Sequence, residues 1–433
     1  MYHKSNEEDP YITLPDVEND ELEDFMIRPS DDVILSAVME EDGWSHLDVC
    51  ILPDSQNAEL YVHHDYMLPA FPLCVAWVPP NMAAVGTFHP QIELWDLNII
   101  DSAEPEAKLE GHEDAVLGLA AHPLHHQMLA SASADTTVRL WDISTQQSIL
   151  TMNHHKTKVQ SLAWSPANSS TEFQGLLASG GFDQKTFIID VRAHENVTEI
   201  PLEADVEALR WLTLEDGANP LLFVSTEAGD VICYDIVAGK RRWTLSAHMG
   251  SPCSSFSLFQ PCPGAPTLLA TATPSTPAPL KLWTIDFSRG GGPSCIYQKT
   301  SDFGRLHSVA FSQERPFHLA MGGHSKHPQV VNVLELGEVQ RAYANIPGLA
   351  IPSHKPSSTL RTMTANDLDG DSDEERDEAG AAAAANGMDM DEEGGDAASP
   401  SSSNRRPAAK KASSSSNKYN KRPAIGASKK KKL

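Results

Sequence analysis

The sequence has few of the features that build disulfide scaffolds, zinc sites or membrane spans. Its six cysteines are spread over 433 residues, and no two of them form a C-x-x-C pair. A zinc ribbon or a disulfide-bonded domain is therefore not expected, and the thiols suit a reducing compartment. There is no basic-then-apolar signal peptide, and no window approaches the roughly 18 uninterrupted apolar residues of a membrane span. We expect a soluble intracellular protein with no membrane partner.

Basic residues are also scarce. The chain has 33 Lys and Arg against 59 Asp and Glu, which gives a formal net charge of −26. Phosphate recognition needs Lys and Arg, so this balance argues against a protein that coats nucleic acid with its whole surface. The charge is uneven: residues 1–44 hold 14 acidic and two basic residues, and residues 45–352 hold 32 and 17.

The C-terminal part joins two blocks of opposite charge. All 13 acidic residues of 353–433 lie between Asp367 and Asp396, whereas 397–433 hold 11 basic residues and no acidic one. Such segments bury too little apolar surface to offset the entropy of ordering. We therefore predict an acidic, largely disordered arm over 1–44, a folded body over 45–345, and a disordered tail over 346–433. The tail is acidic over 366–396 and basic over 397–433.

A repeat with a period in the mid-forties organises the middle of the chain. Aromatic or apolar residues that end one strand of each repeat stand 46, 48, 45, 49 and 50 residues apart. Each period also contains an apolar strand and a strand of small residues, followed by a tight turn. Short β-runs at this spacing predict four-stranded antiparallel sheets, the blades of a β-propeller. The equivalent positions are Trp95, Trp141, Ile189, Tyr234, Trp283 and Val333.

Six such units lie between Leu73 and Leu334, and alternating runs at 46–51 and 60–65 can supply a seventh. The fold class that we predict is all-β, a propeller of seven blades in one ring. Six blades plus an N-terminal hairpin is the alternative. Joining early and late strands in one sheet would close the ring and remove exposed sheet edges.

One repeat resembles a known family. Gly111-His112, then Asp135, then Trp141-Asp142 is similar to the GH…D…WD signature of WD repeats. In that family a strand Ser or Thr joins the His, the turn Asp and the Trp in a buried tetrad of hydrogen bonds. The resemblance implies the tetrad His112, Ser131, Asp135 and Trp141, which leaves no buried polar atom unpaired. Its role is structural, and only this copy is complete.

A closer resemblance covers about residues 20–345. The stretches EDFMIRP at 23–29, YVHHDYMLPAFP at 61–72 and IELWDL at 92–97 resemble the periodic tryptophan protein 1 family of WD-repeat proteins. That resemblance implies a non-catalytic scaffold in the nucleus and nucleolus that serves ribosome biogenesis, chiefly large-subunit assembly and rRNA processing. The partners it implies are ribosome-assembly factors and basic ribosomal proteins, with pre-rRNA or histones as further candidates.

No catalytic, cofactor-binding or metal-ligating set is found in the sequence. Phosphate-binding loops, dinucleotide-binding glycine motifs and nucleophile elbows are missing. His63 and His64 are neighbours on a predicted strand, whose side chains alternate between faces, so we expect that they do not share an ion. His122, His125 and His126 fall in a polar loop without Cys or carboxylate at ligand spacing. We predict that the protein is not an enzyme and takes no cofactor, metal or small-molecule substrate.

Both termini carry candidate recognition segments. Short clusters of Lys and Arg in the tail are typical of nuclear localisation through an import receptor, and they also suit RNA phosphates. Those residues are Arg405, Arg406, Lys410, Lys411, Lys421, Arg422, Lys429, Lys430, Lys431 and Lys432. Ser372, with acidic residues after it, is a candidate for phosphorylation. Phe25, Met26 and Ile27 are the apolar part of the acidic arm and are candidates for a docking segment that folds on binding.

Two other functions remain open. The first is a chromatin or histone-binding propeller that regulates transcription of rRNA genes, because an acidic ring suits a basic tail. The second is a substrate receptor for a cullin–RING ligase, whose W-D-x-R mark is approximated only by Ile189-Asp190-Val191-Arg192.

Overall fold

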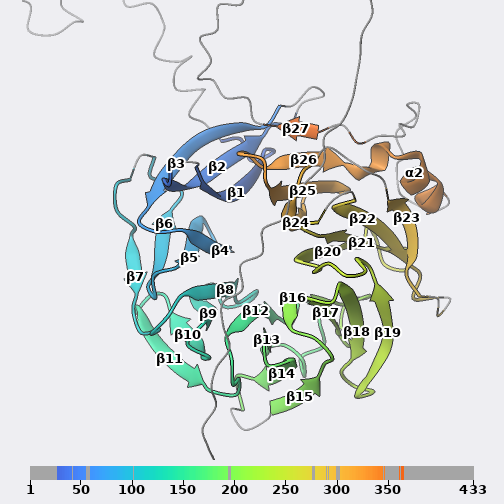
Figure 1. The fold of residues 1–433 in the computed structure, drawn as a ribbon, viewed down its shortest axis with the longest axis horizontal. Coiled ribbons are helices and arrows are strands. Elements are labelled where there is room, and N and C mark those ends of the chain that lie inside the picture. The colour runs from blue at the N-terminus through green and yellow to red at the C-terminus, as the bar shows by residue number, and fades with distance from the viewer. Residues whose placement is uncertain are drawn as a thin grey trace, which may run out of the picture. The chain divides into compact units, whose positions relative to one another are not determined.

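The described residues form a ring of seven antiparallel β-sheets, which we number as blades 1 to 7 in chain order (Figure 1). They come from a computed structural model and fall within one compact unit, residues 1–370; a second unit, 371–433, contains none of them. The prediction of an all-β, seven-bladed propeller is confirmed. The described residues are 27–40, 42–54, 59–100, 102–193, 197–275, 278–288, 290, 292–298, 303–344, 346, 360 and 362–364.

Six blades have four strands each, ordered in the sequence from the centre of the ring outward (Figure 1). Blades 2 to 4 are β4 (Pro72–Val78), β5 (Met82–Thr87), β6 (Ile92–Asp96) and β7 (Ala107–Leu109); β8 (Val116–Ala121), β9 (Met128–Ser133), β10 (Val138–Asp142) and β11 (Gln147–Met152); and β12 (Val159–Trp164), β13 (Leu176–Gly181), β14 (Lys185–Asp190) and β15 (Val197–Pro201).

Blades 5 to 7 are β16 (Val206–Leu212), β17 (Leu221–Thr226), β18 (Asp230–Asp235) and β19 (Lys240–Ser246); β20 (Ser255–Phe259), β21 (Thr267–Ala272), β22 (Leu280–Ile285) and β23 (Ser294–Gln298); and β24 (Leu306–Phe311), β25 (His318–Gly323), β26 (Gln329–Asn332) and β27 (Thr362–Thr364). A 3-10 turn, η2 (Val333–Glu335), and the helix α2 (Gly337–Tyr343) follow β26. Blade 1 has three strands, β1 (Asp32–Met39), β2 (Ser45–Leu52) and β3 (Tyr61–Leu68).

The burial of each strand follows from its place in the blade. In blade 3 the second strand, β9, reads MLASAS and is buried on both faces, because neighbouring blades pack against both sides of the sheet. Small residues there let the sheets come close. The outermost strand, β11, alternates between exposed and more buried residues, as expected for a strand with one solvated face. The sequence order of the strands is therefore also their spatial order in a blade. The apolar strand lies innermost, the strand of small residues lies beside it, and the strand that ends in an aromatic residue comes third.

Two predicted boundaries differ from the structure. β1 begins at Asp32, inside the segment that was predicted to be an arm, and it pairs with β2 over its whole length. β27 lies inside the predicted tail and pairs with β26. Among the described strands, none from the start of the chain joins the last sheet, so the described part of the ring shows no closure by a shared strand. β1 is an apolar stretch inside an acidic segment, and β27 is only three residues long, so the average composition of either segment gives no sign of its strand.

One repeat position is also corrected. Val331, and not Val333, lies opposite Leu319 in the way that Trp141 lies opposite Leu129 and Trp283 opposite Leu269. Val333 is buried two residues further on, in the 3-10 turn η2. The last repeat is therefore two residues shorter than its apolar pattern predicted.

The ring closes where blade 7 meets blade 1, a junction that we call the seam. Arg315, in the loop between β24 and β25, donates hydrogen bonds to the carbonyl oxygens of Ser30, Leu52 and Pro53 at 2.9–3.0 Å and forms an ion pair with Asp32 at 3.4 Å. Lys326, on the other side of the blade, forms an ion pair with a glutamate of blade 1, Glu40. An apolar cluster that includes Cys50, Leu52, Leu60 and Val330 lies between these polar contacts. Side chains therefore make the contacts that join blade 7 to blade 1 at the seam.

Candidate interaction surfaces

The four residues of the predicted tetrad meet in blade 3. The His112 Nδ1 lies 2.7 Å from a carboxylate oxygen of Asp135, and its Nε2 lies 2.6 Å from the Ser131 hydroxyl. The Trp141 indole N–H donates to the same hydroxyl at 2.8 Å. Together these bonds tie the loop before β8, the strands β9 and β10, and the turn between them. The side chains of His112 and Trp141 are buried, so the tetrad holds the blade and offers no free group for chemistry.

The protonation of this tetrad follows from burial and hydrogen bonding. Burial lowers the pKa of His112 in spite of the attraction of Asp135, so the ring is neutral and donates from Nδ1. Burial alone would raise the pKa of Asp135, but hydrogen bonds from Thr137, the Glu113 backbone and His112 outweigh it and lower the pKa to about 2. The carboxylate is therefore ionised and accepts every bond around it.

Blades 4 and 6 carry partial versions of the tetrad. In blade 4, His155 contacts Asp183 and the Ser179 hydroxyl at 3.0 and 2.9 Å, and Ile189 stands where the Trp would be.

In blade 6, the Thr271 hydroxyl lies 3.0 Å from His248 Nε2 and accepts the Trp283 indole N–H at 3.1 Å. The sequence analysis missed this second set, because Ala247 replaces the Gly before the His and no Asp stands between the strands β21 and β22. The available signal was the strand hydroxyl: Thr271 stands 12 residues before Trp283, much as Ser131 stands 10 residues before Trp141.

Blade 5 replaces the tetrad with backbone packing. The turn after β17 contains Gly229, whose φ of +87° favours glycine and whose missing Cβ lets the carbonyl oxygens of His248 and Ser251 approach. The His248 amide donates to the Gly229 carbonyl, and the Cys253 amide donates to Thr226. The turn of blade 5 is thus fixed directly on the loop that enters blade 6.

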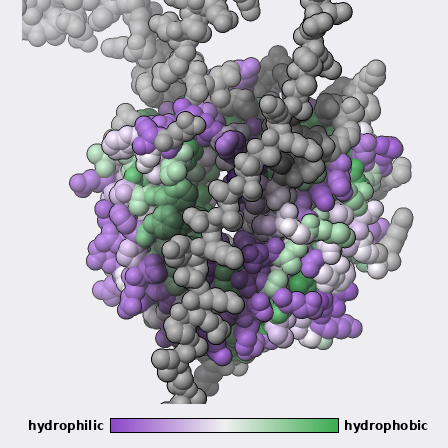
Figure 2. Space-filling model, viewed as in Figure 1, coloured by the Kyte–Doolittle hydropathy of each residue, from purple (hydrophilic) through white to green (hydrophobic). Residues whose placement is uncertain are grey.

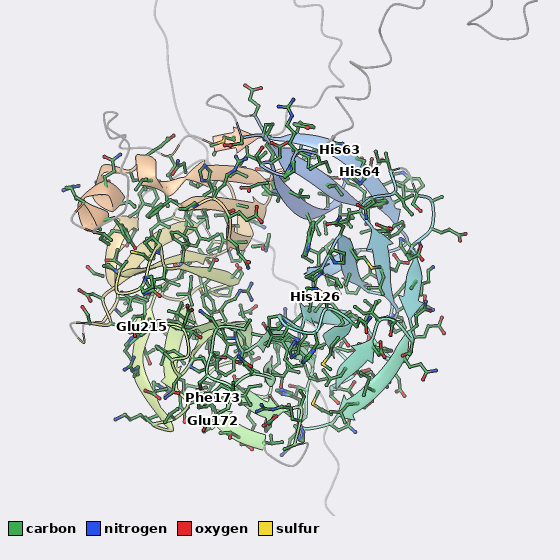
Figure 3. All side chains as sticks on the ribbon, turned by 180° about the vertical axis from the view of Figure 1, so that it is seen from behind. His63, His64, His126, Glu172, Phe173 and Glu215 are labelled. Atoms are coloured by element: carbon green, nitrogen blue, oxygen red, sulfur yellow. The ribbon has the colours of Figure 1, made fainter. Side chains whose placement is uncertain are left out.

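The other histidines have structural surroundings. His63 and His64 lie on β3, apart from His126 in the loop between β8 and β9 (Figure 3). Their Nδ1 atoms approach to 2.7 Å, so the expectation that they point to opposite faces is wrong: the β2–β3 register shifts at this position. His122 Nδ1 accepts the amides of Leu124 and His125. Among the described residues, no three His, Cys, Asp or Glu side chains are grouped to hold a metal ion.

An acidic cluster lies beside the tetrads. We call the side of the ring that carries the His112 loop and the Asp135 turn the tetrad face. On it, Glu207 at the start of β16 stands near Asp205 and Glu227, with Lys158 as the nearby cation. Burial, and then the charges of Glu227 and Asp205, raise the pKa of Glu207 to about 7. Three carboxyl groups therefore lie close together here, with one lysine as the nearby positive charge.

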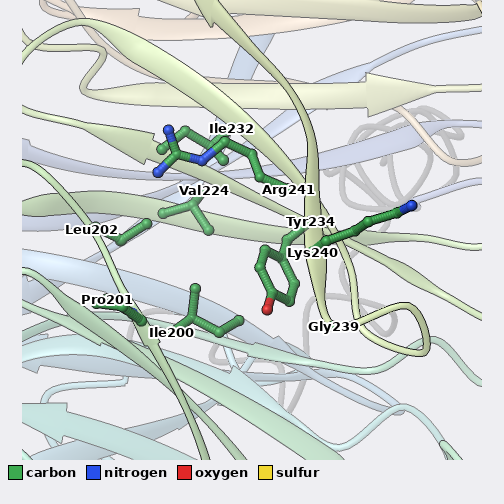
Figure 4. Close-up of a pocket in the computed structure, with 9 residues that line it drawn as sticks. All are labelled: Ile200, Pro201, Leu202, Val224, Ile232, Tyr234, Gly239, Lys240 and Arg241. Carbon is green, nitrogen blue, oxygen red and sulfur yellow. The ribbon is translucent and has the colours of Figure 1, made fainter.

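A groove of about 240 Å³ opens between the outer strands of blades 4 and 5 (Figure 4). Its apolar floor comes from Ile200, Leu202, Val224 and Ile232. Tyr234, Lys240 and Arg241 give it a polar and basic side, with Arg241 in an exposed ion pair with Glu203 at 3.4 Å. The groove suits an apolar side chain that is flanked by acidic groups.

Exposed apolar side chains gather on blades 1 and 2. Figure 2 shows hydrophobic surface over blade 2, whereas most of the visible described surface is hydrophilic. Of the thirteen large apolar side chains that are exposed among the described residues, nine lie between residues 27 and 100. Phe71 and Phe88 belong to this group, and their rings are 5.5 Å apart. Exposed apolar side chains of this kind are typical of protein-binding surfaces.

Several predicted recognition residues lie outside the described residues: Phe25, Met26, Ser372 and the ten basic residues of the tail, from Arg405 to Lys432. Of the docking segment, the structure describes only Ile27, which is 38% exposed. The described helices include none that is long and apolar enough to cross a membrane.

Comparison with known proteins agrees with this geometry. The family model "WD domain, G-beta repeat" matches residues 103–142 and 146–190, which are centred on blades 3 and 4. The ring is therefore a WD-repeat propeller.

The chain is also similar over most of its length to three curated relatives. It is 32% identical to the periodic tryptophan protein 1 homolog of Drosophila melanogaster (72% of this chain, 69% of the relative). It is 29% identical to periodic tryptophan protein 1 of Saccharomyces cerevisiae (71% and 64%). It is 33% identical to an uncharacterized WD repeat-containing protein of Schizosaccharomyces pombe (74% and 65%). The chain covers just under two thirds of the two yeast relatives. It belongs to the periodic tryptophan protein 1 family.

Proposed function

We propose that the chain is a non-catalytic scaffold of ribosome biogenesis in the nucleolus, where it joins assembly factors, basic ribosomal proteins and pre-rRNA during large-subunit assembly and rRNA processing. Membership of the periodic tryptophan protein 1 family carries this proposal. The described ring supports a scaffold role, because its buried His, Ser, Asp and Trp side chains are engaged in holding the blades. The features through which it can bind partners are the acidic cluster around Glu207, the groove, and the exposed apolar side chains of blades 1 and 2.

The tetrad face suits a basic partner. Glu207 has a pKa near neutrality because burial and the neighbouring carboxylates disfavour its charge. A lysine or arginine from a ribosomal protein, placed beside it, would relieve that repulsion and lower the pKa again. The acidic balance of residues 45–352 adds long-range attraction for such a partner.

The tail supports a nuclear address. Its basic clusters offer an import receptor, or RNA phosphates, extended runs of positive charge, and Ser372 in the acidic block is the candidate for phosphorylation. Removal of residues 404–433 should shift the protein toward the cytoplasm in fluorescence microscopy. Unchanged nuclear retention would count against the localisation.

Two alternatives use other observations. A histone-binding propeller that regulates rRNA gene transcription would use the same cluster around Glu207. A cullin–RING receptor would need the arginine of its motif, but the Arg192 guanidinium donates to Asp190 at 2.9 Å and to the carbonyls of Thr171 and Glu172. The scaffold in ribosome biogenesis is therefore preferred.

Affinity purification of the full chain from nuclei, followed by sucrose-gradient sedimentation and mass spectrometry, tests the proposal. We expect the protein to sediment with large-subunit precursors. Nucleosomes or a cullin adaptor, enriched without precursor particles, would overturn it.

A pair of variants tests the tetrad face. Glu207→Gln with Glu227→Gln should weaken the association with basic proteins several-fold. Glu172→Gln with Glu215→Gln also replaces two glutamates, in the loops between the first and second strands of blades 4 and 5, on the opposite face (Figure 3). This control should leave the association unchanged. An equal loss in both variants would mean that only the net charge matters.

A further inference from the structure

Blade 1 has three strands among the described residues, and the apolar cluster of the seam shows which of the four blade positions they take. On the side of blade 7 the cluster takes residues from the second, third and fourth strands. On the side of blade 1 it takes residues from β1, β2 and β3. The residues are Ala320, Val330 and Met363, facing Ile34, Cys50 and Val62. β1 therefore stands in the position of a second strand, and the innermost position beside it has no strand among the described residues.

The loops agree with this assignment. Elsewhere in the ring, the loop between the first and second strands of one blade contacts the same loop of the next, as when the Gly217 amide of blade 5 donates to Asn168 of blade 4. At the seam, the corresponding loop of blade 7 holds Arg315, which bonds to Ser30 and Asp32. Residues 28–31 thus occupy the loop that joins the first and second strands of a blade.

The innermost strand of blade 7 presents an uncovered face toward this position. In blade 4, Ser161 and Ala163 of β12 are buried because β16 covers them: Ser161 Oγ accepts the Leu209 amide and the Ala163 carbonyl accepts the Trp211 indole. In β24, Ser308 stands opposite Gly322 as Ser161 stands opposite Gly180. Ser308 and Ala310 are exposed. No described strand therefore gives β24 the cover that β16 gives β12.

The turn before β1 directs the chain into this position. The Asp31 amide donates to the Arg28 carbonyl at 3.0 Å, and the Arg28 amide donates to the Asp31 carboxylate at 3.2 Å. Pro29 follows Arg28, as is common in type I turns. A chain that continued this hairpin would run antiparallel to β1 and would bring position 27 opposite Asp32 and position 25 opposite Ile34.

The sequence before the turn has the pattern of an innermost strand. In three blades, the first, fourth and sixth residues of this strand are apolar and pack against the preceding blade. The sets are Val159, Leu162 and Trp164; Val206, Leu209 and Trp211; and Leu306, Val309 and Phe311. Residues 22–27 read LEDFMI, which places Leu22, Phe25 and Ile27 at the same three positions.

We propose that residues 20–27 bind along the edge of β1 that pairs with no described strand, as the innermost strand of blade 1, with Leu22, Phe25 and Ile27 packed against β24. The docking surface for Phe25 and Ile27 is then the chain's own ring, and the Ser308 hydroxyl accepts the Phe25 amide as Ser161 accepts that of Leu209. Binding completes the fourth strand of blade 1 and covers the seam.

Two point variants of the full chain test this interaction. Phe25→Asp places a charge against β24 and should lower the Tm by roughly 5 °C. It should also speed amide hydrogen exchange several-fold in β1 and β24, but not in β12–β14. Met26→Arg is the matched control, because position 26 corresponds to Arg210 of β16, which is exposed. Its Tm and exchange should stay those of the parent chain.

Two truncations keep the test decisive if Phe25→Asp folds poorly. Removal of residues 1–19 should leave the Tm unchanged, and removal of 1–27 should lower it. A labelled peptide of residues 18–28 should bind the shorter chain in fluorescence anisotropy, and the same peptide with Phe25→Asp should bind at least tenfold more weakly. The proposal would be overturned if both truncated chains had the same Tm. It would also be overturned if Phe25→Asp lost a binding partner while the Tm and the hydrogen exchange of the chain stayed unchanged.

Discussion

Blade 3 and the seam hold the ring together in different ways. In blade 3, four side chains within 30 residues of one another form an unbroken set of hydrogen bonds from Trp141 to Asp135. At the seam, Arg315 reaches carbonyl groups more than 260 residues away in sequence. The tetrad recurs in part in other blades and leaves a sequence signature, whereas the Arg315 contacts occur once. Repeat signatures therefore report the blades, and they say little about how the ring closes.

The largest expected effect breaks the seam. Arg315→Ala leaves three carbonyl groups and the half-buried Asp32 without their cation, which should cost about 3 kcal/mol of unfolding free energy. Urea unfolding measures the loss. Arg241→Ala, which removes only the exposed ion pair with Glu203, is the control and should change stability by less than about 0.5 kcal/mol.

Thiol labelling locates the effect of Arg315→Ala. Burial raises the pKa of Cys50 to about 12, so this seam thiol reacts only when the seam opens. Cys50 should be labelled faster in Arg315→Ala, while Cys253 in blade 6, also buried, should keep its rate. Equal acceleration at both thiols would mean that the ring unfolds as a whole.

The next effect sharpens the comparison within the tetrads. Ser131→Ala removes the partner of both His112 and Trp141, whereas Ser179→Ala removes only a partner of His155, because the Ile189 side chain has no N–H to satisfy. We expect losses of about 2–3 and about 1 kcal/mol, measured by urea unfolding. Equal losses would contradict the view that the indole bond contributes.

A smaller effect concerns the stability of the fold at acidic pH. Burial, and then the charge of Lys281, lower the pKa of His248 from 6.5 to about 4, so the folded state binds this proton less well than the unfolded state. Its contribution to stability is therefore full above pH 6.5 and is lost as the pH falls toward 4, by roughly 2 kcal/mol. Unfolding at a series of pH values should show a shallower acid slope for His248→Gln than for the parent chain. Parallel slopes would contradict this.

The smallest effect has the opposite sign. The folded state raises the pKa of Glu207 from 4.5 to about 7, so its contribution is full below pH 4.5 and is lost as the pH rises through 7. Glu207→Gln should raise the free energy of unfolding at pH 8, because it removes a charge that the folded state disfavours. The gain should be only about 1 kcal/mol, since the site is partly solvated, and there should be little effect at pH 5. Glu199→Gln, an exposed glutamate of blade 4, is the control. Calorimetric unfolding of both variants at pH 5 and pH 8 measures these changes in stability.

Much of the blade architecture could be predicted from the sequence. The spacing of Trp95, Trp141 and Trp283 reports one strand of each blade, and the GH…D…WD pattern identifies the residues that meet in blade 3. These signals are local and repeat, so they do not depend on which distant segments come together.

The ends of the ring could not be predicted in the same way. The apolar stretch at 32–39 lies in an acidic segment, and β27 is only three residues long, so neither changes the average composition. The contacts of Arg315 carry no periodic signal. The approach of His63 and His64 depends on a shift in strand register, which a rule of simple alternation does not contain. Closure and local irregularity are properties of the assembled ring.

The seam also has a mechanical consequence. β1 and β27, the first and last described strands, both border it, so the two ends of the ring's chain emerge at the same joint. Tension applied between the two ends would act on the Arg315 contacts and the cluster around Cys50, with no backbone ladder between the described strands of blades 7 and 1 to share the force. A pulling experiment should therefore show the ring opening at a lower force than the force that extracts a blade.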